Sequence, residues 1–115
     1  MVSVETATAM ALSFPEVEEK SHFSQPDFRL RNKIFAVMHA ERNEMMVKLT
    51  IIDQSVFCNI DKGMIYPVPG GWGRKGATLV NLQKVNKRIL KDALFRAWKT
   101  VAPTRLILQY FPGNK

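Results

Sequence analysis

Apolar and polar residues change their spacing several times along the chain, and each change marks a predicted element. Near the N-terminus, apolar residues recur every three or four positions and stop before Pro15, which predicts a helix over residues 3–13. From there to Leu49, short runs alternate between polar and apolar residues and are separated by turn-forming residues. This alternation predicts a meander of antiparallel strands at residues 18–23, 27–31, 34–39 and 45–49.

The rest of the chain predicts two helices, with strands and a glycine-rich loop between them. Residues 50–60 have apolar residues at helical spacing before a Lys-Gly stop, and the expected buried face is Ile52, Val56, Phe57 and Ile60. Residues 65–68 and 78–82 predict strands on either side of a loop at 70–76. Asn86 is a typical N-cap for a long helix to about Ala102, whose expected apolar face is Leu90, Leu94, Ala97, Trp98 and Val101.

This order of elements predicts an α+β fold in which helices pack on one face of an antiparallel β-sheet. The chain has 115 residues, 46% of them hydrophobic, and no internal repeat or interdomain linker. A single domain over residues 1–115 with a buried core is therefore expected. Residues 104–115 form a tail for which the pattern allows either a strand or a further helical turn.

Charge is distributed very unevenly along the sequence. Residues 1–61 carry 6 basic and 9 acidic side chains, whereas residues 62–115 carry 11 basic side chains and Asp92 alone. An excess of this kind favours a polyanionic partner, with DNA as the first expectation. No apolar run is long enough to cross a membrane, and the N-terminus lacks the basic start of a signal peptide. The single Cys58 fits a reducing, cytoplasmic location.

Basic side chains gather in a strand, a loop and the long helix. We expect them to share one face of the protein and to bind DNA phosphates through counterion release. Each group also has an ordinary interpretation as a solvated surface. The predicted phosphate-binding residues are Arg29, Arg31, Lys33, Lys48, Arg74, Lys75, Lys84, Arg88 and Lys91.

The glycine-rich loop resembles a phosphate-binding loop only in part. Counted from Gly71, the P-loop pattern reaches Gly76 but then meets Ala77 where lysine is required, and a strand follows instead of a helix. The structural interpretation is that Gly71, Gly73 and Gly76 allow positive φ angles while Trp72 seals an edge of the core.

Residue types that perform catalysis or bind metals are present without a supporting motif. His22, His39 and Cys58 are separated in the sequence and accompany no known constellation. The acidic group around Glu18 lacks a further ligand for a metal ion. We therefore expect a protein that is not an enzyme and that needs no metal or cofactor.

Several segments resemble the MmcQ/YjbR family of small bacterial proteins. The resemblance rests on residues 12–15, 26–36, 67–78 and 97–103. It implies a fold related to the frataxin (CyaY-like) α+β sandwich and the DNA binding often ascribed to the family. Ala77 departs from the aromatic residue expected there, and the apolar tail could pack on the sheet or on a second copy, so monomer and homodimer both stay open. The first helix has only Glu5 as an acidic residue, which argues against the iron handling of frataxins.

Together, the charge and the resemblance predict a DNA-binding protein that acts mainly through phosphate contacts. The alternative is a protein-interaction domain, or an accessory domain that captures a small anionic ligand with its sheet face or its Trp72 loop.

Overall fold

The computed structural model describes residues 1–22 and 24–113, so the predicted end of the first strand at residue 23 lies outside the described part. The helices and strands follow the predicted order closely. In chain order they are α1 (Val4–Leu12), β1 (Val17–His22), β2 (Gln25–Leu30), β3 (Lys33–His39), the 3₁₀ turn η1 (Ala40–Arg42), β4 (Glu44–Lys48), α2 (Ile51–Cys58), β5 (Ile65–Pro67), α3 (Gly71–Arg74), β6 (Ala77–Asn81), α4 (Lys87–Val101) and α5 (Thr104–Tyr110).

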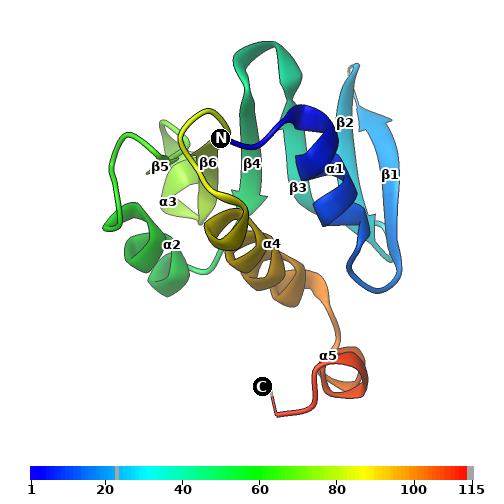
Figure 1. The fold of residues 1–115 in the computed structure, drawn as a ribbon. Helices are drawn as coiled ribbons and strands as arrows, with labels where there is room; N and C mark the ends of the chain where they lie inside the picture. The colour runs from blue at the N-terminus through cyan, green and yellow to red at the C-terminus, as the bar shows by residue number, and fades with distance from the viewer. Residues whose placement is uncertain (23, 114–115) are drawn as a thin grey trace.

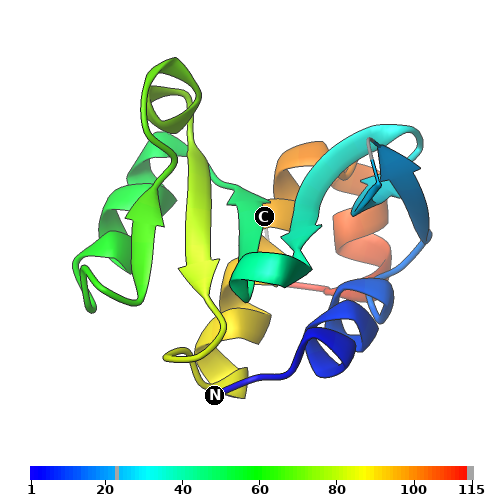
Figure 2. The same cartoon turned by 90° about the horizontal axis from the view of Figure 1, so that it is seen from above.

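The strands form one antiparallel sheet of six strands in the order β1-β2-β3-β4-β6-β5 (Figure 1). Helices α1 and α4 pack against β3, and α4 also packs against β4, so both lie in front of the sheet in Figure 1. Figure 2 shows α1 and the beginning of α4 on the same side of the strands. The predicted α+β architecture, with an antiparallel sheet and helices on one face, is confirmed.

The core lies between α4 and the covered face of the sheet. The side chain of Asn86 accepts a hydrogen bond from the backbone N–H of Ile89 at 2.8 Å, which confirms the predicted N-cap. Trp98 is completely buried and donates its indole N–H to the carbonyl of Pro15 at 3.1 Å. The buried side chains of α4 are Leu90, Ala93, Leu94, Ala97, Trp98 and Val101, which include every member of the predicted apolar face.

The tail forms the helix α5, which resolves the choice that the sequence left open for residues 105–111. Leu106 and Ile107 are buried, and the ring of Phe111 lies 4.7 Å from that of Phe95 on α4. These apolar side chains of the tail therefore pack on the same chain.

Helix α2 is correctly predicted, but most of its expected apolar face is exposed. Ile52 is 77% exposed and Val56 is 59% exposed, whereas Phe57 and the polar Gln54 are buried. The helix turns this way because the Gln54 amide binds the turn between β5 and β6, and Phe57, three residues later, joins it on the inner side.

Candidate functional site

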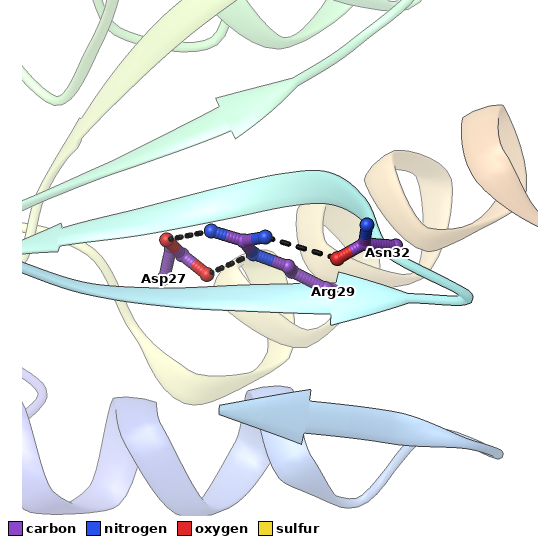
Figure 3. A network of polar contacts seen from close by, with 3 residues as sticks. All are labelled: Asp27, Arg29 and Asn32. Atoms are coloured by element: carbon purple, nitrogen blue, oxygen red, sulfur yellow. Dashed lines mark hydrogen bonds and ion pairs between the residues drawn. The ribbon is translucent and has the colours of Figure 1, made fainter. Parts of the chain in front are cut away.

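The three cations predicted on the β2–β3 hairpin differ in whether they are paired with a carboxylate. Arg29 forms a bidentate ion pair with Asp27, with Nε–Oδ1 at 2.8 Å and Nη2–Oδ2 at 3.1 Å, and also donates to Asn32 (Figure 3). Asp27 is only 1% exposed, and its hydrogen bond raises the pKa of Arg29 above the ordinary value. The charge of Arg29 is thus largely neutralised by this buried carboxylate.

Arg31 is also paired with an acidic residue of the N-terminal half. Its Nε lies 3.1 Å from Oε1 of Glu16, and both side chains are well exposed. Lys33 is exposed and forms no ion pair within the described residues. The hairpin therefore contributes one unpaired cation to the surface instead of three.

Unpaired cations are concentrated at the beginning of α4 and in the turn that precedes it. Lys84, Arg88 and Lys91 are exposed, as is Lys87, which was not among the nine predicted residues. The first turn of α4 contains no acidic residue, and within residues 1–22 and 24–113 none of these four side chains forms an ion pair. The nearby Asp92 instead lies 3.7 Å from Arg96. We call these four residues the α4 basic cluster.

Lys48 and Lys75 belong to the other side of the sheet. Side chains alternate along a strand, so Lys48 points away from the core that its neighbour Val47 enters. The two lysines line a hollow of about 340 Å³ with Ile34, Met46, Trp72 and Ala77. Arg74 lines a different hollow beside Pro67 and Pro69. The expectation that all nine cations share one face is therefore wrong, because strand and helix cations lie on opposite sides of the sheet.

Trp72 is 74% exposed, so the prediction that it seals an edge of the core is wrong. Of the three glycines named in the prediction, only Gly76 has a positive φ angle. Gly73 is needed for a different reason: a Cβ atom there would lie 1.8 Å from the carbonyl oxygen of Val68. Residues 71–74 form the short helix α3 within the predicted loop, and Trp72 projects from it.

The side chain of Gln54, on α2, holds the turn between β5 and β6 in place, a role that no sequence motif indicates. Its buried amide nitrogen donates to the carbonyl of Gly73 at 2.8 Å, to that of Ala77 at 3.2 Å and to the hydroxyl of Thr78 at 3.1 Å. Thr78 in turn donates to the carbonyl of Gly76 at 2.9 Å. The turn that carries Trp72 is therefore held by several buried hydrogen bonds.

Two of the titratable groups considered for catalysis, His39 and Cys58, are partly buried. Burial lowers the pKa of His39, whose Nδ1 lies 2.9 Å from the Gln25 amide nitrogen. Burial raises the pKa of the Cys58 thiol, which makes it a weaker nucleophile at neutral pH. The side chain of His22 lies outside the described part of the chain. Within the described residues, no three His, Cys, Asp or Glu side chains are placed to hold a metal ion.

In the part of the chain that the structure describes, no helix has the length and apolar character needed to cross a membrane.

The fold and the basic surfaces define a small α+β protein built on one six-stranded antiparallel sheet. A family model described as YjbR matches residues 12–100, and the chain belongs to the YjbR family. The crystal structure of the Deinococcus radiodurans protein DR2400, described with a DUF419 domain, has the same fold, with a TM-score of 0.77. The two sequences are 14% identical, and the match covers 95% of this chain and 88% of that chain. Among curated proteins, no significant sequence match was found.

Proposed function

We propose that this protein binds DNA through phosphate contacts made mainly by the α4 basic cluster. The observation that carries the proposal is the exposure of Lys84, Lys87, Arg88 and Lys91 without a carboxylate partner among the described residues. A cytoplasmic location, in keeping with the single free Cys58, is part of the same proposal. The proposed contact requires neither a catalytic residue nor a cofactor.

Two members of the cluster, Lys87 and Arg88, lie in the first turn of α4, where their charge is unfavourable for the stability of the helix. The start of a helix carries a partial positive charge, so cations there lower stability by about 0.3–1 kcal/mol each at low salt. An anionic partner at this position is attracted both by the basic side chains and by the helix dipole, so its binding offsets the loss of helix stability. A bound phosphate would therefore relieve this unfavourable interaction, which supports the proposed contact.

The spacing of the cluster suits a phosphate backbone. Lys87 to Lys91 span about one helical turn, or about 6 Å along the axis. B-DNA carries one negative charge for about every 1.7 Å of its axis, so several phosphates fall within reach of the cluster. If four phosphates are neutralised, the logarithm of the affinity should fall with the logarithm of the salt concentration at a slope of about −3.6.

The experiment is a titration of labelled duplex DNA at several salt concentrations. Replacing Lys87, Arg88 and Lys91 by glutamine should weaken binding and bring the slope close to −1, because about three phosphate contacts are lost. The control replaces three exposed basic residues outside the cluster by glutamine, which keeps the net charge of the two variants equal: Lys20, Lys33 and Arg105. Equal weakening in both variants, or a slope near zero for the unmodified protein, would refute the proposed interface.

A further inference from the structure

The hollow beside Trp72 combines an apolar floor with positively charged walls. The side chains of Ile34, Met46 and Ala77, from three neighbouring strands, are partly exposed and line the hollow. Trp72, Lys75 and Lys48 complete it, and its volume is about 340 Å³. This size lies at the lower end of the range of small-molecule sites, about 300–1,000 Å³. We call it the Trp72 hollow.

The exposure of Trp72 is enforced by the turn that carries it. Gly73 lies so close to Val68, and Gly76 so close to Leu49, that neither position has room for a side chain. The buried Gln54 amide holds the same turn from α2. A large aromatic ring is thus kept in solvent by a rigid support, although burial would ordinarily favour folding. Tryptophan is also enriched among the residues that contribute most to binding at protein interfaces.

The charges around the ring are positive. The ammonium group of Lys75 lies 5.9 Å from the centre of the Trp72 ring, within the range of a cation–π interaction. Lys48 is exposed and pairs across the strands with Ala77 in the floor. The residues that line the hollow include no carboxylate, and within the described part of the chain neither lysine forms an ion pair. A ligand that fits would therefore be planar, apolar on one face and negatively charged at one end.

We propose that the Trp72 hollow binds an unstacked nucleobase that carries a phosphate group. The base stacks on the Trp72 ring, and the phosphate lies between the ammonium groups of Lys75 and Lys48. Two sources share this chemistry: a free mononucleotide and an unpaired base of a single strand. The hollow lies on the face of the sheet opposite α4, so this site does not depend on the phosphate contacts proposed for the α4 basic cluster.

Tryptophan fluorescence tests the site directly. Trp98 is completely buried, so quenching by a ligand on the surface reports Trp72. The probes are adenosine 5′-monophosphate, adenosine, inorganic phosphate and a short single-stranded oligodeoxyadenylate. We expect saturable quenching by the monophosphate and by the oligonucleotide, weaker quenching by adenosine and none by phosphate alone. Tighter binding of the oligonucleotide than of the monophosphate would identify a single strand as the source, and equal affinities would identify a free nucleotide.

Two variants separate stacking from charge. Trp72→Leu should weaken binding of a labelled oligonucleotide about tenfold or more, because base–aromatic stacking contributes that much. Replacing Lys48 and Lys75 by glutamine should weaken the binding of adenosine 5′-monophosphate but leave the binding of adenosine nearly unchanged. Two matched controls should leave binding unchanged. One is Tyr110→Leu, at an exposed aromatic residue on α5, and the other replaces Lys20 and Lys62 together by glutamine.

Two outcomes would overturn the proposed site. One is an absence of saturable quenching by both the monophosphate and the oligonucleotide. The other is a Trp72→Leu variant that has an unchanged unfolding temperature and an unchanged affinity for the labelled oligonucleotide. The glutamine variant of the α4 basic cluster should still show the quenching, and Trp72→Leu should still bind duplex DNA. Failure of this site is therefore distinguishable from failure of the proposed DNA contact.

Discussion

Replacing Gly76 by alanine should destabilise the protein far more than the same change at Gly71. Gly76 has a φ angle of +112°, and a Cβ atom there would lie 1.9 Å from the carbonyl oxygen of Leu49. The backbone N–H of Leu49 also donates to the carbonyl of Gly76 at 3.0 Å, so the two segments cannot separate without breaking that bond. Gly71 has no positive φ angle, and its nearest neighbour is the flexible end of Arg74 at 3.9 Å.

The magnitude follows from these two differences. A left-handed conformation costs a residue with a side chain about 1–2 kcal/mol, and forcing a methyl group against backbone adds about 1–3 kcal/mol. Gly76→Ala should therefore lower the free energy of unfolding by about 3 kcal/mol or more. Gly71→Ala should raise it by about 0.4–1 kcal/mol, because alanine loses less backbone entropy on folding.

Thermal unfolding followed by circular dichroism measures both effects. For a chain of this length, 1 kcal/mol corresponds to about 4 °C in Tm. We expect Gly76→Ala to lower Tm by about 10 °C or more and Gly71→Ala to leave it equal or slightly higher. A Tm for Gly76→Ala within about 2 °C of the unmodified protein would show that the close approach to Leu49 does not exist.

Two further predictions concern polar pairs on the uncovered face of the sheet. Burial and a hydrogen bond to Glu44 raise the pKa of Tyr66 from 10.0 to about 12. Tyr66 therefore loses its proton at a lower pH in the unfolded chain than in the folded protein. The free energy of unfolding should consequently fall as the pH rises from 10 to 12. Urea unfolding across this range should show a smaller decline for Tyr66→Phe; an identical decline would contradict the assignment. Asp27→Asn should lower the free energy of unfolding by about 1.5–3 kcal/mol, because it weakens the charge-assisted hydrogen bonds between Arg29 and a carboxylate that is only 1% exposed. Chemical denaturation measures this effect, and a loss below about 0.5 kcal/mol would show that the pair is not stabilising.

The elements of the fold could be predicted because their signals are local. The N-cap Asn86 and the apolar stripe of α4 lie within one helix, and alternation marks each strand. The role of Gln54 could not be predicted in this way, because its partners lie 19 to 24 residues further along the chain. Apolar spacing alone therefore predicts that Ile52 and Val56 are buried, although both are exposed.

The candidate site was only partly predictable, for similar reasons. Asp27 and Arg29 are two positions apart on one strand, so their pairing could have been inferred from alternation. The pairing of Arg31 with Glu16 depends on how two distant turns meet. The exposure of Trp72 contradicts the usual tendency of tryptophan to be mostly buried, and only the packing of the glycine turn accounts for it.

The two outer strands of the sheet also limit how it can associate. One edge is β1, with the consecutive charges Glu18, Glu19 and Lys20, and the other is β5, which has three residues and ends at Pro67. Charged, short or proline-containing edges discourage the addition of another strand. Assembly of neighbouring molecules into a continuous sheet is thus disfavoured at both edges, and the uncovered face is the part of this sheet that stays open to a binding partner.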